Sequence, residues 1–341
     1  MIFNDVLEIR NGRNQKNVEN PDGKYPIYGS GGIMGYADDY ICEADTVIIG
    51  RKGNINNPIF VEEPFWNVDT AFGLSAKREV LLPRYLYYFC RNFDFERLNK
   101  AVTIPSLTKS DLLKIEIELP SMESQQKVVD KLSKIEQIIQ MRKQELQRLD
   151  ELIKARYVEM FYDKGYPVLK WNDVFNTTTG KQDSNAAVDG GAYPFFTCSK
   201  EVLRIDDYAF EEEALLLAGN NAAGKYDVKY YSGKFNAYQR TYVLTLKENW
   251  SYRLFQYQLE DKLAYLQQQS LGGLTKYLTL KILGELEFII PPKKQQDKFD
   301  LFIKQVDKSK VAVQKALDET QTKAIDETQL LFDSLMQKYF G

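Results

Sequence analysis

Two long stretches of the chain repeat hydrophobic residues at alternating intervals of four and three. In the first stretch the apolar positions are Val128, Leu132, Ile135, Ile139, Leu146, Leu149, Ile153 and Met160. In the second they are Phe299, Ile303, Val306, Val313, Leu317, Ala324 and Leu331. This heptad spacing is typical of helices that pack against another helix through one apolar seam. We therefore predict two long spacer helices, over residues 121–162 and 292–341.

The rest of the chain has a different pattern. Residues 1–120 and 163–291 contain short β-branched and aromatic runs separated by Gly, Asn and Asp clusters, which is typical of strands and turns. Each segment also has a helical pattern near its end, over 83–98 and over 252–268. The expected fold class is α+β, with two mixed α/β domains, each followed by one of the long helices.

The two halves of the chain resemble each other in sequence. Residues 25–31 recur, 168 residues further along, as residues 193–199. Leu107 and Thr108 recur as Leu278 and Thr279, with an offset of 171. Self-similarity of this kind indicates two copies of one structural unit.

The order of these units predicts how the helices run. The first helix leads from the first domain to the second, and the second helix leaves the second domain with an apolar seam still to be buried. We expect it to lie back along the first helix, so that the two form an antiparallel coiled coil. The two domains would then be related by a pseudo-two-fold axis.

Composition excludes several kinds of chemistry. The 341 residues include no histidine, which is the usual general base near neutral pH and the commonest metal ligand. The three cysteines, Cys42, Cys90 and Cys198, form no C-x-x-C pair, and we interpret them as reduced thiols in the core. We therefore expect no catalytic residue, no metal site and no cofactor bound by this chain.

Charge and hydropathy limit the possible binding partners and the expected cellular location. The net charge is −3, so any binding to nucleic acid must depend on local groups and not on an overall field. No run of 18 apolar residues is present, and the first residues lack the pattern of a signal peptide. These features favour a cytoplasmic protein without a membrane partner.

One segment resembles a phosphate-binding loop. Residues 219–225 fit the G-x-x-x-x-G-K part of that motif, but the next residue is Tyr226 where the motif has Ser or Thr. The residues that follow predict a strand and a turn, and not the helix whose N-terminus would hold phosphate. Nucleotide hydrolysis is therefore the weaker interpretation.

With these kinds of chemistry set aside, the remaining interpretation is that the chain binds a partner through surface side chains. Residues 225–242 carry four cations, one acid and six aromatic residues. Lys and Arg neutralise phosphates, and Arg, Asn and Gln side chains make paired hydrogen bonds to base edges. The candidates in the second domain are Asn220, Asn221, Lys225, Lys229, Tyr230, Lys234, Tyr238, Gln239 and Arg240. Those in the first domain are Arg10, Arg13, Asn14, Gln15, Lys16, Arg51, Lys52, Asn54, Asn56 and Asn57.

Composition alone leaves an alternative. Half of the tyrosines could pack the sheets while the lysines face water. The chain could also be a two-headed interaction protein that binds protein or glycan partners through its tyrosine-rich loops. Binding to DNA should weaken steeply with salt, whereas a tyrosine-rich protein contact should not.

Over its whole length the chain resembles the specificity subunit of a type I restriction-modification system. The resemblance rests on two recognition domains that alternate with long helices, and on the segments at which the helices begin. These segments are residues 104–108 and 119–126 in the first copy, and residues 278–280 and 290–296 in the second.

The resemblance implies that each domain reads one half of a split site on double-stranded DNA. It also implies that the helices separate the two readers and dock methyltransferase subunits, two of them in the complete complex. S-adenosylmethionine and the catalytic residues would then belong to those partners, and a restriction subunit is a further partner. Because one DNA turn is about 34–36 Å, we expect short half-sites separated by a gap of about 6 base pairs. Because the loops of the two domains differ, the target should be asymmetric.

Overall fold

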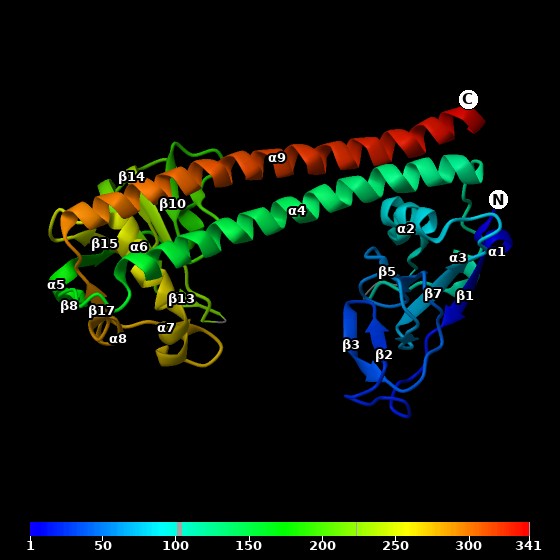
Figure 1. Ribbon diagram of the computed structural model, residues 1–341, viewed down its shortest axis with the longest axis horizontal. Helices are drawn as coiled ribbons and strands as arrows, with labels where there is room; N and C mark the ends of the chain where they lie inside the picture. The colour runs from blue at the N-terminus through cyan, green and yellow to red at the C-terminus, as the bar shows by residue number, and fades with distance from the viewer. Residues whose placement is uncertain (101–103, 223, 341) are drawn as a thin grey trace. The chain divides into compact units, whose positions relative to one another are not determined.

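The computed structural model describes residues 1–100, 104–222 and 224–340, and the side chains up to residue 323. It divides into two compact units, one formed by Met1–Gln144 with the helical segment from Lys315, the other by Glu145–Gln314. Both divisions fall inside long helices, α4 (Met122–Phe161) and α9 (Lys293–Phe340), which connect the units (Figure 1). The two long helices predicted from the heptad pattern are thus confirmed.

The first unit contains an antiparallel sheet and a smaller mixed sheet, together with the first part of α4. The larger sheet has the strand order β1-β7-β4-β5, and the smaller has the order β3-β2-β6. Its elements are α1 (Phe3–Val6), β1 (Leu7–Asn11), β2 (Tyr25–Gly29), β3 (Gly32–Ala37), β4 (Thr46–Gly50), β5 (Ile59–Val61), β6 (Trp66–Asn67), β7 (Ala71–Ala76), α2 (Pro83–Asn92), η1 (Phe95–Leu98) and α3 (Lys109–Leu112).

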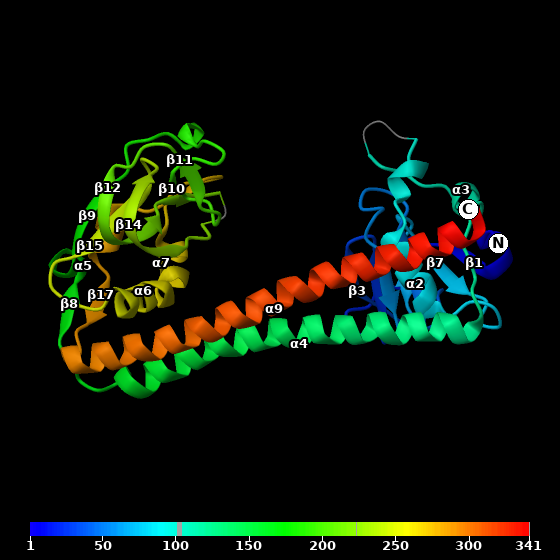
Figure 2. The ribbon, with the colours of Figure 1, turned by 90° about the horizontal axis from the view of Figure 1, so that it is seen from above.

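The second unit has a six-stranded sheet of order β11-β10-β14-β12-β15-β9, and α6 packs against β12 and β14 (Figure 2). Two small strand pairs, β13-β16 and β17-β8, complete it. The elements are β8 (Val168–Lys170), α5 (Trp171–Val174), β9 (Phe175–Thr179), η2 (Ser184–Ala186), β10 (Tyr193–Phe196), β11 (Leu203–Ile205), β12 (Phe210–Ala218), β13 (Asn220–Asn221), β14 (Val228–Ala237), β15 (Thr241–Leu246), α6 (Tyr252–Asp261), α7 (Leu263–Gln269), β16 (Lys276–Tyr277), α8 (Leu280–Gly284) and β17 (Glu287–Ile289).

Strand pairing confirms the internal repeat. In the first unit β2 pairs in parallel with β6, and Ile27 lies opposite Trp66. In the second unit β10 pairs in parallel with β14, and Phe195 lies opposite Asn236, with offsets of 168 and 170 from the first pair. The antiparallel pairs β1-β7 and β9-β15 also correspond, as do β4-β7 and β12-β15. The two sequence copies are therefore two copies of one α+β fold.

Two predicted helices differ from the observed ones. The helix predicted over 83–98 ends as α2 at Asn92, because Phe93 is extended and Asp94 caps the separate turn η1. The helix predicted over 252–268 is divided at Lys262 into α6 and α7. The period of apolar residues continues through both breaks, so the pattern alone did not reveal them.

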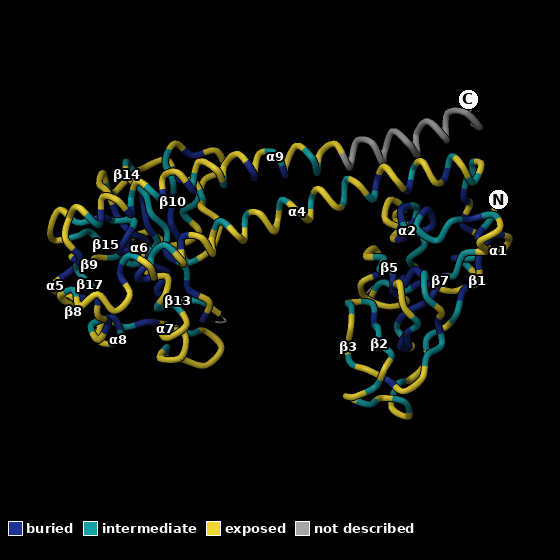
Figure 3. The backbone as a smooth tube through the Cα atoms, in the orientation of Figure 1, coloured by how far each residue is buried: buried dark blue, intermediate teal, exposed yellow. Residues whose placement is uncertain are grey.

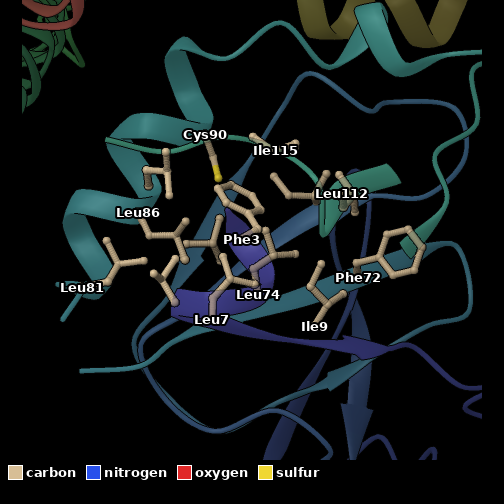
Figure 4. Close-up of a cluster of buried hydrophobic side chains, with 14 of the residues drawn as sticks. Phe3, Leu7, Ile9, Phe72, Leu74, Leu81, Leu86, Cys90, Leu112 and Ile115 are labelled. Atoms are coloured by element: carbon tan, nitrogen blue, oxygen red, sulfur yellow. The ribbon is translucent and has the colours of Figure 1, made fainter. Parts of the chain in front are cut away.

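A dense apolar cluster forms the core of the first unit. Phe3 lies among side chains from β7, α2 and α3, and its ring meets that of Phe89 edge to face at 5.6 Å (Figure 4). Cys90 lies in the same cluster with 1% of its surface exposed, and burial raises the pKa of its thiol. Cys42 is also buried, and burial raises its pKa to about 12. Both thiols are free, as predicted for core cysteines.

The apolar seam residues of the long helices pack in two different clusters, one in each unit. At the start of α4, Val128, Leu132 and Ile135 pack on the core of the first unit. Inside the second unit the end of α4 packs antiparallel against the start of α9, with Ile153 beside Phe299, Ile303 and Val306. Asp150 and Lys310 form an ion pair between these segments. The antiparallel pairing predicted for the helices is thus observed within this unit.

The other seam positions follow the same stripe. Ile139, Leu146 and Leu149 are half-buried, and Val313 and Leu317 are buried. Polar residues around them leave much of α4 exposed (Figure 3). The predicted seam residues Ala324 and Leu331 lie outside the side chains that the structure describes.

A buried glutamine attaches each long helix to its domain. The Gln125 amide donates to the carbonyls of Val80 at 2.9 Å and Pro120 at 3.1 Å, and its Oε1 accepts from the Leu82 amide at 2.9 Å. Gln296, 171 residues later, repeats this arrangement with Pro291 and Ser251. Each glutamine therefore joins the first turn of a long helix to the start of a domain helix.

We expect Gln125→Leu to lower the free energy of unfolding by about 1–3 kcal/mol, because it leaves buried backbone groups at Val80 and Leu82 without partners. Urea unfolding followed by circular dichroism would measure the change. Gln126→Leu is the matched control, because Gln126 is exposed and, among the described residues, its side chain bonds only to Asp130 of the same helix. Equal destabilisation by the two variants would contradict the anchoring role.

Candidate nucleic-acid interface

Several loops of the second unit meet at one end of the large sheet. The Gly219 amide donates to the Arg240 carbonyl at 2.9 Å, and the Leu278 amide donates to the Gly219 carbonyl at 2.8 Å. The Tyr238 amide donates to the Phe196 carbonyl at 2.9 Å. We call the resulting surface the second-domain face; it comprises residues 181–183, 197–199, 219–222, 224–225, 238–240 and 276–277.

The first unit builds the corresponding surface with the same bonds. The Arg51 amide donates to the Thr70 carbonyl at 2.7 Å, and the Leu107 amide donates to the Arg51 carbonyl at 2.9 Å. The Val68 amide donates to the Tyr28 carbonyl at 2.9 Å. The first-domain face comprises residues 13–16, 29–31, 51–54, 69–70 and 105–106. Backbone bonds hold both faces, so the side chains on them are free to differ.

One glycine in each domain is required by a close approach of the backbone. A Cβ atom on Gly12 would lie 1.8 Å from the Val68 carbonyl oxygen, and one on Gly180 would lie 1.8 Å from the Ala237 carbonyl oxygen. Both glycines immediately precede residues of their face, and each amide bonds to the start of the neighbouring strand. Without a side chain at these two positions, the backbone of the loop can approach the backbone at the end of the sheet closely.

The second-domain face brings together part of the predicted set. Lys225, Gln239 and Arg240 are exposed, and Asn220 and Asn221 are half-buried on β13. The Gln239 amide donates to an Asp183 carboxylate oxygen at 3.4 Å. Within the described part of the chain, the Arg240 guanidinium makes neither a hydrogen bond nor an ion pair, while its carbonyl belongs to the framework. Tyr238 is half-buried beside Gln182.

Three other candidates of the second domain have partners within the fold. Lys229, only 15% exposed, pairs with Asp227 and donates to the Ser199 carbonyl at 2.7 Å. The Tyr230 hydroxyl donates to Glu213 at 2.7 Å, and burial, followed by that carboxylate, raises its pKa to about 12. Lys234 lies over the ring of Tyr208, 4.5 Å from its centre. The hydrogen bond to that tyrosine, followed by the charge of Glu211, raises the Lys234 pKa.

In the first domain Arg13, Asn14, Lys16, Arg51, Lys52 and Asn54 are exposed on the face, and Gln15 is half-buried there. Asn57 is exposed beyond it. Arg51 donates weakly to the Asp69 carbonyl at 3.4 Å and lies 5.8 Å from the centre of the Phe72 ring. These contacts orient its guanidinium without neutralising it.

Arg10 and Asn56 are engaged inside the first domain. Arg10 donates to the Ile41 carbonyl at 2.7 Å and pairs with Glu8. Asn56 accepts from the Phe95 amide at 2.7 Å and donates to Asp94 at 3.1 Å. Apart from Glu8, these partners lie 31 to 39 residues away along the chain, so the local sequence could not reveal them.

The prediction missed several residues of the faces. Lys181 and Gln182 are the counterparts of Arg13 and Asn14 at the offset of 168, and Lys276 lies on β16 beside Asn221. Applying the repeat offset to the first-domain candidates would have found Lys181 and Gln182. No comparable signal marked Lys276, because only strand pairing brings it to the face.

The phosphate-loop resemblance has no counterpart in the fold. The Gly219 amide is occupied by the Arg240 carbonyl, and Tyr226 is buried just before β14 begins at Val228. Ala223 of that motif lies outside the described residues. In the part of the chain that the structure describes, no group of His, Cys, Asp or Glu side chains is arranged to hold a metal ion. Within the same residues, every helix is too short or too polar to cross a bilayer.

Cys198 corrects one prediction. It is half-buried on the second-domain face, at the edge of the core cluster against which it packs, and not fully buried like Cys42 and Cys90. Its sulfur contacts the Arg240 carbonyl at 3.4 Å and the Thr241 hydroxyl at 3.9 Å. The residue lies at a sheet end where loops meet, and its polar neighbours Thr197 and Ser199 agree with this partly exposed position.

Comparison with known proteins assigns the family. The model of the type I restriction modification DNA specificity domain matches residues 3–151 and again residues 164–320. The chain belongs to this family. Each match covers one copy of the repeat, so we refer to the first and second specificity domains.

Individual relatives carry the same description. The type I restriction enzyme EcoDI specificity subunit of Escherichia coli is 33% identical over 156 residues, which cover 44% of this chain and 34% of that protein. This chain therefore matches about a third of the length of that relative. A putative type I specificity subunit of Mycoplasma pneumoniae is 26% identical over 215 residues, covering 60% of this chain and 79% of that protein.

Solved structures share the fold. The S subunit of a type I restriction-modification system from M. genitalium matches with a TM-score of 0.64 at 16% identity, over 96% of this chain and 94% of that one. A chain from a study of complex assembly in a type I system matches with a TM-score of 0.54 at 15% identity, over 98% and 96%.

We expect Gly180→Ala to disorder the second-domain face and to lower stability by about 1–3 kcal/mol, because the added methyl group overlaps the Ala237 carbonyl. Thermal unfolding would measure the loss. Gly284→Ala serves as the control, because a Cβ there meets nothing within 4 Å. A Gly180→Ala variant as stable as this control would refute the close-approach argument.

Proposed function

We propose that this specificity subunit reads a split, asymmetric target on double-stranded DNA and docks two methyltransferase subunits. The observation that carries the proposal is a shared backbone framework presenting different side chains in the two domains. Arg51 and Gly219 occupy equivalent positions, as do Thr70 and Arg240, because the same backbone bond joins each pair. In the first domain the arginine is the residue whose amide donates this bond, and in the second it is the residue whose carbonyl accepts it. The two guanidinium groups therefore start from different positions of the shared framework.

The different side chains favour different half-sites. Arg is the commonest side chain to read guanine, and Asn or Gln reads adenine. The first-domain face offers Arg51, Lys52 and Asn54, whereas the second offers Asn220, Gln239 and Arg240. Two readers with unlike donors and acceptors should select unlike sequences. The target is then asymmetric, with half-sites about one DNA turn apart and a gap of about 6 base pairs.

Local charge supports contact with phosphates. Arg13, Lys16 and Lys52 in the first domain, and Lys225 in the second, are exposed cations. Such groups neutralise phosphates and position a protein, while base contacts specify the sequence. Because the net charge is −3, we expect basic partner subunits to supply the rest of the attraction.

The long helices offer a surface for those partners. Ile138 and Met141 on α4 are 42% and 67% exposed, and Leu301 and Val311 on α9 are 60% and 70% exposed. We infer that partner subunits cover these side chains, since an aliphatic side chain gains free energy when a partner removes it from water. In this proposal the methyltransferase subunits bind S-adenosylmethionine and carry the catalytic residues, and this chain is not itself an enzyme. A restriction subunit would join through the same assembly.

We expect Arg240→Ala to weaken binding to the specific target by about 1–3 kcal/mol, because a bidentate contact to a base would be lost. Gel-shift titration of the complex with methyltransferase subunits on target and random duplexes would measure it. Lys234→Ala is the matched control, because Lys234 is engaged with Tyr208 and Glu211.

The outcomes separate three interpretations. A loss on target DNA alone assigns base reading to Arg240. An equal loss on random DNA would make Arg240 a phosphate contact. Phosphate contacts release counterions, so affinity for DNA should fall as the salt concentration rises. If the affinity of the complex without substitutions does not change with salt, the two-headed interaction protein is favoured instead.

We expect exchange of residues 163–291 for the corresponding domain of another family member to change one half-site and to leave the other. The physical reason is that each face is built by backbone bonds within its own domain. Single-molecule sequencing of methylated DNA, from cells expressing the chain with its methyltransferase, would reveal the target. A change in both half-sites would show that the domains do not read independently.

A further inference from the structure

A fully exposed leucine stands on a loop of the second domain. Leu274 is 95% exposed, and no other large apolar side chain in the described part of the chain is as exposed. It follows two glycines, of which Gly272 has a φ of +102°, a conformation that favours glycine. In Figure 1 this loop follows α7 and extends from the body of the second unit. Water is an unfavourable environment for an aliphatic side chain, so the position calls for an apolar partner.

The loop is held in a defined frame. The Leu271 amide donates to the Tyr277 carbonyl at 3.0 Å, and the Tyr277 amide donates to the Leu271 carbonyl at 2.9 Å. These two bonds close a hairpin whose apex carries Leu274. The side chains of Leu271 and Tyr277 at its base are 48% and 42% exposed. The loop is therefore a small apolar projection on a fixed base.

The frame joins this projection to the second-domain face. Tyr277 lies opposite Asn220 in the β13-β16 pair, and Lys276 lies opposite Asn221. A Cβ on Gly224 would lie 3.4 Å from Cγ of Lys276, so the loop preceding Lys225 packs beside the hairpin. The hairpin that carries the leucine is therefore joined at its base to the residues proposed to contact bases and phosphates.

Charge around the projection complements DNA. Residues 263–284 include Lys276 and Lys281 and no carboxylate side chain. An apolar tip that rises from an acid-free, lysine-bearing segment suits a polyanion with an apolar interior. Stacked base pairs surrounded by phosphates have this character.

The first domain has a corresponding feature. Ile104 is 59% exposed on the equivalent loop, and the next residue, Pro105, accepts from the Gly53 amide at 3.0 Å. Residues 97–110 also contain no acid and include Arg97, Lys100 and Lys109. Lys100 pairs with Asp111, so this segment is less positive than its counterpart. Part of the loop, residues 101–103, lies outside the described residues.

We propose that Leu274 is a wedge that enters between two base pairs of the half-site read by the second domain. The inference rests on the proposed DNA-reading function and adds a mode of contact to it. An inserted aliphatic side chain partly unstacks one base step and bends the duplex, which brings more of the protein surface against the DNA. Flexible pyrimidine–purine steps unstack most easily, so the wedge would add sequence preference without a hydrogen bond to a base.

The test uses the full chain assembled with its methyltransferase subunits, and duplexes in which 2-aminopurine replaces each adenine of the target in turn. This base fluoresces more strongly when it is unstacked. We expect fluorescence to rise several-fold at one base step of the second half-site, distinct from any base that the methyltransferase extrudes from the stack, and to stay near the free-duplex value at that step with Leu274→Ser. Affinity for the target should fall about tenfold in that variant, while affinity for random DNA is unchanged.

Leu280→Ser is the matched control, because Leu280 is 58% exposed on α8 of the same domain. It should retain both the fluorescence change and the affinity. A complex that binds its target with flat fluorescence at every position other than the base extruded by the methyltransferase would overturn the wedge while leaving the proposed function intact. A complex with no affinity for DNA would overturn both. Weaker assembly of Leu274→Ser with the methyltransferase in the absence of DNA would reassign the loop to a protein contact and also overturn the wedge.

Discussion

Each specificity domain depends on one backbone hydrogen bond that crosses its face. The bond joins the Arg51 amide to the Thr70 carbonyl in the first domain, and the Gly219 amide to the Arg240 carbonyl in the second. Buried or half-buried backbone groups at a sheet end must find partners. Because backbone atoms satisfy them here, the bond requires no particular side chain at Thr70 or Arg240. Gly219 is the exception, since a Cβ there would lie 2.3 Å from the Arg240 carbonyl oxygen. The same framework can then hold different side chains in the two domains, as the proposed reading of two unlike half-sites requires.

The long helices add a second constraint. Gln125 and Gln296 lie 171 residues apart, and each bonds the backbone at the start of a domain helix. A buried amide is favourable only when its donors and acceptors are paired, so the angle at which each helix leaves its domain is closely defined. Each specificity domain and its long helix are therefore joined by polar contacts as well as by the apolar residues of the seam. This coupling suits a protein proposed to measure distance along DNA.

Much of the fold was predictable because its signals are periodic. The heptad stripe predicted α4 and α9, and the repeat predicted two similar domains, since both depend only on the spacing of residue types. The candidate site was less predictable. Arg51, Arg240 and Gln239 lie on the faces, whereas Lys229, Tyr230 and Lys234 are held by Asp227, Glu213 and Glu211. All six residues are polar and looked alike as candidates in the sequence, and only the folded structure shows which of them have a close carboxylate partner in or directly before a strand of their own sheet.

The sequence by itself determined the two-copy plan, the α+β class, the long helices and the lack of histidine chemistry. These depend on composition and on the order of residues along the chain. Tertiary structure decided which cations are exposed, placed Cys198 on a face, and set Leu274 at the apex of a hairpin beside Asn220. Exposure and pairing are properties of groups far apart in sequence. Register and loop closure determine them, and a local pattern does not encode either.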